Sequence, residues 1–417
     1  MSGRWSVIIR SHAPLPAKYS VQRAMSVFFP QGYPHSVSAS YLKYSSWSSA
    51  GSILSSASGV LATSSLLVAL GVSSSAALPF SAATTWVLKD GLGQLGGVLY
   101  AALLGTSFDA DPKRWRQVSA LALDGAGVLE VCILALAPLH VLPFLPCAAL
   151  ANVARNVAWL SASATRAGLH SALARRGNLA DITAKAGSQS TAAATLGTAL
   201  GVSLSLLAEH PTAALALYLT LAAGHQLCVY NSLQAVVLPT LSSARLHLAW
   251  QHAVAQEAWD PRQLRSPEEV NALEHFLPWQ APLAPPHLRI VQDPRGHGLE
   301  GVHEFAVAGE AAPSHLLVAA ACGKMHVFLA KGASTDSVLL AHLHAERTVW
   351  ELSRAPCRAL GTRVAAAARA GEWVQRCGSD VLAALGQAGW RVTDPVVDGV
   401  LARRFDFERL VAQETGK

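Results

Sequence analysis

The chain has 417 residues, of which 51% are hydrophobic and only 14% are charged, whereas ordinary globular proteins carry roughly 25% charged residues. Residues 1–240 hold 14 Lys/Arg and 7 Asp/Glu, a net charge of +7, and residues 241–417 hold 18 and 19, a net charge of −1. A basic excess confined to the apolar half favours a lipid bilayer with anionic headgroups as the partner, and we expect no nucleic-acid partner. The six cysteines form no Cys-x-x-Cys pair, which argues against a disulfide-framed secreted domain.

Residues 1–27 are expected to form a basic, disordered tail. Arg4, Arg10, Lys18 and Arg23 lie in this range together with several serines and no acidic residue. These are features of an organelle transit peptide, for which a plastid is one destination, and a short disordered tail is the alternative.

Residues 28–245 are expected to form a helical membrane domain. The stretch between Lys43 and Lys89 contains no charge, and apolar segments of about 20 residues, long enough to cross a bilayer, recur to residue 238. Asp111-Pro112 is typical of a helix start. The basic residues fall between hairpins so that they share one side. The fold is therefore predicted to be mainly α, a multi-pass transmembrane bundle of about six helices, with a soluble Ala-rich bundle as the alternative.

Small residues recur at helical spacing in two of these segments. Gly93 and Gly97 form one Gly-x-x-x-Gly pattern, and Gly197 and Gly201 form another. This spacing predicts a close approach of two helix backbones.

Ionisable and polar residues interrupt the apolar segments at several places. On a helix beginning near residue 178, Asp181, Lys185, Ser188 and Gln189 share one face, and Asp181 can pair with Lys185. Charges at membrane depth indicate a functional site, although each can also be tolerated by pairing or by snorkelling to an interface. Asp124 and Glu130 are a further example. The predicted ligand-binding residues, converging on a polar cavity and its mouth, are Lys89, Asp90, Gln94, Asp124, Arg155, Asn156, Arg166, Asn178, Asp181, Lys185, Ser188 and Gln189.

From Phe29 to about Leu241 the chain resembles the root UVB-sensitive family. The resemblance rests on three long stretches: FPQGYPHSVSASYLKYSSW, TTWVLKDGLGQLGGVLYAALLGTSFDADPKRWR and ASATRAGLHSALARRGNLADITAKAGSQSTAAATLGTALG. It implies a membrane protein without an established catalytic activity. It also implies links to ultraviolet-B responses, auxin transport and pyridoxal-phosphate homeostasis, action in plastids for some members, and joint action of two members as partners.

The remainder of the chain is expected to be different in kind. Residues 246–300 are predicted to be a Pro-rich linker, and residues 301–417 a smaller α+β domain. Its strands are predicted in HEFAVA, SHLLVAAACG and KMHVFLAKG, and its helices in DSVLLAHLHAERTVWEL and RVAAAARAGEWVQRCGSDVLAALGQAGW.

Motifs for catalysis or metal binding are weak in this half. Only His342 and Glu346 share a helix face, with His344 on another, and no second cluster completes a metal site. Cys322 is interpreted as a core residue of a strand. We therefore predict no catalytic residue, metal ligand or cofactor, and a protein that is not an enzyme.

Two functions remain open from the sequence. A carrier or binding protein for a small anionic metabolite predicts a polar cavity between helices. A membrane scaffold that binds another family member predicts filled space between helices and an exposed apolar patch. A soluble helical binding protein is a third alternative.

Overall fold

A computed structural model describes residues 26–69, 79–104, 108–136, 144–208, 210–280, 288–290, 315–319, 325–329, 333–354 and 360–393. The chain divides into two compact units. The first unit comprises Met1–Lys89, Asp124–Ala151 and Leu173–Ala235, and the second comprises Asp90–Leu123, Asn152–Ala172 and Val236–Lys417. Most of the described residues are helical, so the prediction of a mainly α fold is confirmed.

Long helices follow one another from residue 41 to residue 235. They are α2 (Tyr41–Ala69), α3 (Pro79–Leu104), α4 (Pro112–Leu136), α5 (Phe144–Leu173), α6 (Leu179–Ser205) and α7 (Pro211–Ala235). Three of them begin at proline, whose missing N–H and fixed φ suit the first helical position. The predicted start of α4 is confirmed, because the Arg114 main-chain N–H donates to Asp111 Oδ1 at 3.2 Å.

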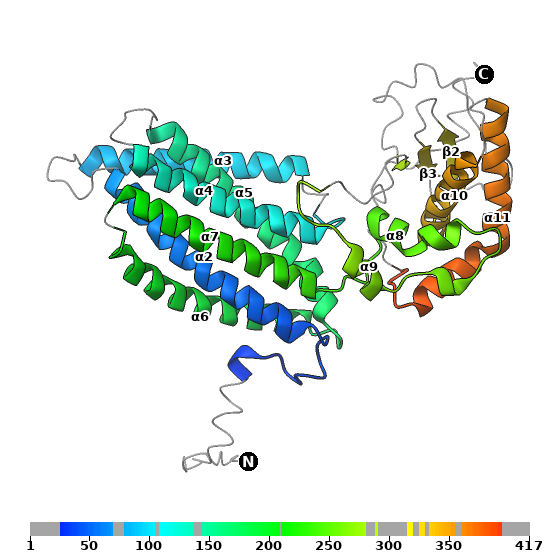
Figure 1. Cartoon of the computed structure of the whole chain (residues 1–417), viewed down its shortest axis with the longest axis horizontal. Helices are drawn as coiled ribbons and strands as arrows, with labels where there is room; N and C mark the ends of the chain where they lie inside the picture. Colours follow the sequence, from blue (N-terminus) through cyan, green and yellow to red (C-terminus); the bar gives the residue numbers. More distant parts are fainter. Residues whose placement is uncertain are drawn as a thin grey trace, which may run out of the picture. The chain divides into compact units, whose positions relative to one another are not determined.

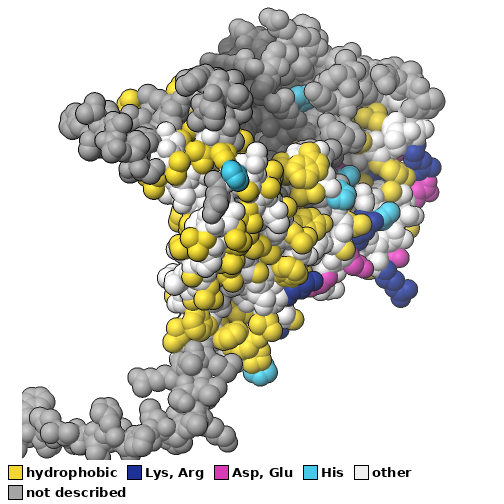
Figure 2. All heavy atoms as spheres, turned by 60° about the vertical axis from the view of Figure 1, so that its left-hand side comes forward, with side chains coloured by type: hydrophobic (Ala, Val, Ile, Leu, Met, Phe, Trp, Pro, Cys, Tyr) yellow, Lys and Arg dark blue, Asp and Glu magenta, His cyan; other side chains and the backbone are white. Residues whose placement is uncertain are grey.

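Three of these helices, α2, α7 and residues Pro112–Leu134 of α4, are long and apolar enough to cross a membrane. The others also present large apolar side chains to their surroundings, and Figure 2 shows hydrophobic side chains over much of the face it views. Val98 and Leu103 on α3, Trp159 on α5 and Leu196 on α6 are between 64% and 81% exposed. Such side chains are favourable in lipid and unfavourable in water. The count of six spans stays a prediction.

Within the first unit, α2 packs against both α6 and α7 (Figure 1). The α2–α6 contact depends on the second predicted glycine pattern. A Cβ at Gly197 would lie 2.2 Å from the Ile53 carbonyl oxygen, and one at Gly201 would lie 2.7 Å from the Ala57 carbonyl oxygen. Only hydrogen atoms fit there, so the predicted close backbone approach is confirmed.

The first glycine pattern also lies at a helix contact, within the second unit, but there the glycines meet side chains and not the opposite backbone. A Cβ at Gly93 would lie 2.2 Å from Asn152 Nδ2, and one at Gly97 would lie 3.1 Å from Asn156 Cβ. Helices α3 and α5 therefore meet where α3 carries no side chain.

The C-terminal part of the second unit combines helices with a small sheet. Its helices are α8 (Ser243–Val254), α9 (Pro267–Leu273), α10 (Thr335–Ser353) and α11 (Leu360–Gln387), with a 3₁₀ turn η3 at Pro261–Gln263. Strands β1 (Leu288–Ile290), β2 (His315–Ala319) and β3 (Met325–Leu329) lie in the order β1-β3-β2, with β3 parallel to β1 and antiparallel to β2. Strands β2 and β3 fall inside two predicted strands, while HEFAVA and Cys322 lie outside the described residues.

Helices α8 and α9 occupy part of the range 246–300 that was predicted to be a Pro-rich linker. Leu246, Ala249, Trp250 and Ala253 recur at helical spacing along α8 and are fully buried. They join Val338 and other side chains of α10 and α11 in one apolar core. The periodicity is present in the sequence, but the prolines that follow it dominate the composition of the range.

Candidate functional site

The polar face of α6 binds the main chain of residues 26–31, which we call the N-terminal strap. The Gln31 main-chain N–H donates to Asp181 Oδ2 at 2.6 Å. Lys185 Nζ donates to the Ser26 carbonyl oxygen at 2.6 Å, and Gln189 Nε2 donates to the Phe28 carbonyl oxygen at 2.6 Å. One helix face thus holds residues 26–31 by bonds that do not depend on the side chains of that segment.

The remaining predicted residues near the start of α6 make local bonds. Ser188 Oγ donates to the Ala184 carbonyl oxygen at 3.3 Å, and Asn178 Oδ1 accepts from the Arg176 main-chain N–H at 3.5 Å. The predicted polar face of α6 is therefore present in the structure. Three of its residues, Asp181, Lys185 and Gln189, bind the N-terminal strap, which lies 150 to 161 residues earlier in the chain.

Replacing Lys185 by methionine together with Gln189 by leucine is expected to release the strap. Both changes keep most of the apolar stem of the side chain but remove the donors to Ser26 and Phe28. The Gln31 amide, which Asp181 protects, should exchange with solvent roughly tenfold faster or more. Hydrogen exchange measures this directly, with Ser188→Ala as the control variant. Unchanged exchange at Gln31 would show that the strap is held by other contacts.

Five other predicted residues lie in the second unit. Asp90 Oδ1 accepts from Asn152 Nδ2 at 3.2 Å, and Asn156 Nδ2 donates to the Asn152 carbonyl oxygen at 2.9 Å. Gln94 and Arg166 are exposed, and Arg155 is half-buried. The contact between Asp90 and Asn152 ties α3 to α5, beside Gly93. Lys89, the residue before Asp90, belongs to the first unit and is buried.

Asp124, on α4, is the centre of a buried polar cluster in the first unit. The His225 Nδ1 atom lies 3.0 Å from Asp124 Oδ1 and 2.9 Å from Asp124 Oδ2. The Gln226 Nε2 atom donates to Asp124 Oδ2 at 2.5 Å. Asp124 is 6% exposed and His225 4%. We call Asp124, His225 and Gln226 the Asp124 cluster.

Tyr218 connects the cluster to the apolar packing around it. Its hydroxyl donates to the main-chain carbonyl oxygen of Asp124 at 2.9 Å. A Cβ at Gly127 would lie 2.0 Å from the same hydroxyl oxygen, so the ring reaches α4 only because residue 127 has no side chain. Tyr218 also belongs to a core with Leu61 of α2 and Val131 of α4.

The setting of the cluster makes it the strongest candidate site. It joins α4 to α7, two helices that are long and apolar enough to cross a membrane. An ionised carboxylate in such surroundings is expensive unless it is paired and hydrogen-bonded. The sequence selected Asp124 but missed His225, Gln226 and Tyr218. Their one signal is polar spacing of seven and eight residues inside an otherwise apolar helix.

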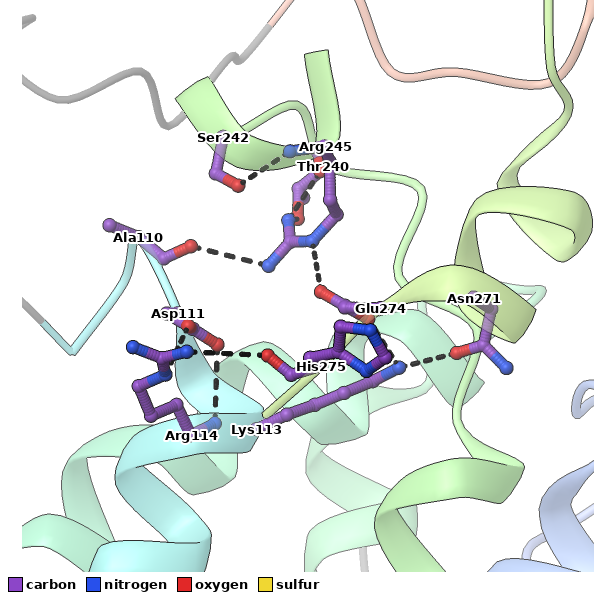
Figure 3. A network of polar contacts seen from close by, with 10 residues as sticks. All are labelled: Ala110, Asp111, Lys113, Arg114, Thr240, Ser242, Arg245, Asn271, Glu274 and His275. Atoms are coloured by element: carbon purple, nitrogen blue, oxygen red, sulfur yellow. Dashed lines mark hydrogen bonds and ion pairs between the residues drawn. The ribbon is translucent and has the colours of Figure 1, made fainter. Parts of the chain in front are cut away.

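A second buried network lies in the second unit (Figure 3). Lys113 Nζ donates to Glu274 Oε2 at 2.7 Å and also bonds Asn271 Oδ1, while Arg245 Nε donates to Glu274 Oε1 at 3.0 Å. Lys113 is fully buried and Arg245 is 1% exposed. The Arg245 guanidinium is further satisfied by the Ala110 carbonyl oxygen at 3.2 Å. Two cations thus share one carboxylate.

The charges of this network act on each other's ionisation. Burial by itself raises the pKa of the Glu274 carboxyl, but the positive charges of Lys113 and Arg245 outweigh burial and hold the pKa below its ordinary value. Burial, and then the negative charge of Glu274, raise the pKa of Asp111. The three charged side chains at the centre of Figure 3, Lys113, Arg245 and Glu274, all have partners within the protein, which fits a structural network better than an open ligand site.

His342 and His344 of α10 are both buried, and His342 Nε2 has no hydrogen-bond partner among the described residues. His247 Nδ1, on α8, lies 2.8 Å from Glu346 Oε2, and His344 Nε2 donates to the Ala367 carbonyl oxygen at 2.9 Å. Burial lowers the pKa of His342 to about 4. Among the described residues, no group of three or more His, Cys, Asp or Glu side chains is placed to hold a metal ion.

The low pKa of His342 predicts a loss of stability in mild acid. The unfolded chain takes up this proton near the ordinary value of 6.5, whereas the folded chain resists it down to about 4. Stability is therefore complete above pH 6.5 and falls as the pH drops through this window, by about 3 kcal/mol. Urea unfolding of His342→Leu should show a flatter pH dependence, whereas the same change at exposed His252 should not. Identical slopes for the wild type and His342→Leu would contradict this origin.

Comparisons with known proteins agree on one family. A family model described as the vitamin B6 photo-protection and homoeostasis domain matches residues 16–257. The chain is 30% identical over 336 residues to protein root UVB sensitive 3 of Arabidopsis thaliana, covering 78% of this chain and 74% of that protein. It is 32% identical over 254 residues to RUS family member 1 of Dictyostelium discoideum, covering 60% of this chain and 47% of that protein.

A third relative carries a location in its name. Protein root UVB sensitive 2, chloroplastic, of Arabidopsis thaliana is 34% identical over 242 residues, covering 58% of this chain and 54% of that protein. The chain therefore spans about half the length of two of these three relatives. No solved structure matches the chain.

Proposed function

This chain belongs to the root UVB sensitive family, and we propose that it is a multi-pass membrane protein that binds and carries a small anionic solute of the vitamin B6 class. The solute class follows from the description of the family domain, which links it to vitamin B6 homoeostasis. The protein would act without catalysing a reaction.

The Asp124 cluster is the single observation that carries the proposal. Its carboxylate lies at 2.9 Å from an imidazole nitrogen inside helices of membrane length. A pair that only joined α4 to α7 would be replaceable by apolar side chains with no loss, and often with a gain, of stability. Ionisable side chains retained at such a place mark solute or ion pathways.

The proposal includes a topology. Helices α2 to α7 would form six spans, and the basic residues 113–116 and 166–176 would face one side together with the C-terminal α+β region. On that side Arg166 would attract an anion. The membrane would be that of an organelle, and the chloroplast is one candidate because of the name of one relative.

A binding experiment with two vitamers tests the proposal. Pyridoxine phosphate lacks the aldehyde that reacts with lysines, and unphosphorylated pyridoxine lacks the anionic group. The phosphate form should raise the unfolding temperature of the purified protein in lipid nanodiscs by about 2–4 °C at saturation. The increase should vanish in Asp124→Asn with His225→Gln, and persist in Thr220→Ala, which alters an exposed side chain on α7. No shift with either vitamer would reject a vitamin B6 solute.

A membrane scaffold is the second candidate. Trp279 is 70% exposed and Leu273 is 42% exposed, and both lie in the second unit outside the long helices. An exposed tryptophan and an exposed leucine six residues apart in the sequence favour a protein partner, and another family member would be that partner. Trp279→Ala should then abolish its capture while the vitamer shift is unchanged.

A further inference from the structure

We propose that the Asp124–His225 pair takes up and releases a proton inside the first unit, so that a proton is the second ligand of this chain. The geometry of the pair carries this proposal independently of any solute. Its use in transport rests on the proposed function.

The contact fixes which ring nitrogen is free to exchange a proton. His225 Nδ1 lies between the two oxygens of the Asp124 carboxylate, at 3.0 and 2.9 Å. Because a carboxylate only accepts hydrogen bonds, Nδ1 must carry a hydrogen and donate. The proton therefore adds to Nε2: an N–H bond forms from the ring lone pair as an O–H bond of hydronium or water breaks, which leaves water or hydroxide, and no group is oxidised or reduced.

Among the described contacts of His225, Asp124 supplies the negative charge. Helix α4 presents the Asp124 carboxylate, and α7 itself presents Gln226, a neutral amide that donates to the same carboxylate. Helix α2 meets α7 at Gly51, where a Cβ would lie 3.6 Å from His225 Cδ2 and 3.3 Å from Cβ of Cys228, a thiol on the same helix. The Cδ2 edge of the ring thus lies against a residue without a side chain.

The electrostatic energy of the Asp124 cluster differs between the state with a neutral His225 ring and the state with a protonated one. With a neutral imidazole the cluster carries the single negative charge of Asp124, and with an imidazolium it is a neutral ion pair. In apolar surroundings the net charge sets the energy, so the proton compensates the carboxylate. An exchangeable compensating charge is the working element of proton relays in membrane proteins.

Proton uptake would also favour an anionic solute. An anion beside the cluster is repelled by a lone carboxylate and much less by a neutral ion pair, so solute and proton bind with positive coupling. By linkage the coupling is reciprocal. The proposed solute would therefore enter together with a proton.

Infrared difference spectroscopy of the full chain in nanodiscs tests the proton site without any solute. A pH step between about 5 and 9, a range in which imidazoles titrate, should change carboxylate and imidazole bands in the wild type. These changes should be absent from the double variant Asp124→Asn with His225→Gln, which keeps hydrogen-bonding groups and leaves no unpaired charge. Spectra of the two proteins that change identically with pH would overturn the proposal.

A second arm separates this inference from the proposed function. Binding of pyridoxine phosphate to the wild type should be about tenfold tighter at pH 6 than at pH 8, beyond the change produced by titration of the phosphate itself near pH 6. Binding without this difference, together with silent infrared bands, would refute the proton site and leave the solute proposal intact. pH-dependent infrared bands without any binding of pyridoxine phosphate would refute the solute proposal and leave the proton site intact.

Discussion

Replacing Glu274 by glutamine is expected to destabilise the second unit by about 3–5 kcal/mol. The glutamine has nearly the same shape but no charge, so it leaves Lys113 and Arg245 buried at 0% and 1% exposure without the carboxylate they share. Chemical unfolding followed by tryptophan fluorescence measures the loss, because Trp250 and Trp390 lie in the core of this unit.

A surface ion pair supplies the matched control. Glu257 Oε1 lies 3.0 Å from Arg354 Nη1, and the two side chains are 78% and 54% exposed. Glu257→Gln removes the same charge from a solvated position and should cost about 1 kcal/mol or less. Equal losses at Glu274 and Glu257 would mean that the buried network contributes nothing beyond a solvated pair.

The same network sets a pH dependence. The Glu274 pKa is lowered in the folded protein, so its stabilisation is complete above the unfolded value near 4.5 and is lost as the pH falls through the folded value. The raised pKa of Asp111 acts in the opposite direction, because the folded protein keeps that proton more readily. Glu274→Gln should remove the pH dependence that comes from Glu274. It should also weaken the one that comes from Asp111, because the negative charge of Glu274 is one cause of the raised Asp111 pKa.

The substitution Gly197→Ala is expected to cost about 3 kcal/mol or to prevent folding of the first unit. The new Cβ would lie 2.2 Å from the Ile53 carbonyl oxygen and 2.8 Å from Ser56 Cβ. A backbone oxygen cannot move aside as a flexible side chain does, so α2 and α6 must separate.

The control for this prediction lies on the same helix. A Cβ added at Gly187 would meet no other atom within 4 Å, and Gly187→Ala should instead stabilise α6 by about 0.5–1 kcal/mol. Thermal unfolding in detergent compares both variants with the wild type. Equal effects of the two substitutions would show that the α2–α6 contact does not depend on Gly197.

The features that could be predicted from the sequence depend on residues close together in the chain. The start of α4 at Asp111-Pro112 and the approach at Gly197 and Gly201 follow from short spacings with a direct steric or hydrogen-bonding reason. The polar face of α6 was likewise visible at helical spacing. Its partner was not, because Lys185 bonds a carbonyl oxygen 159 residues earlier, and main-chain acceptors have no sequence signature.

The same limit explains the missed members of the candidate site. Asp124 stood out as a charge in an apolar segment, whereas its partner His225 lies 101 residues later, on a different apolar helix. Glu274 lay in a range that proline content assigned to a linker. Its role depends on Lys113, 161 residues away. Pairings over such distances are set by the packing of whole helices and not by any local pattern.

Uptake by proteoliposomes tests most directly the claim that the Asp124 cluster is the site of a membrane carrier. Wild-type protein should accumulate labelled pyridoxine phosphate roughly tenfold or more above protein-free vesicles. The Asp124→Asn, His225→Gln double variant, reconstituted to the same amount, should not exceed them, while Thr220→Ala should match the wild type. Uptake by the double variant equal to that of the wild type, or no uptake by the wild type at all, would contradict the claim.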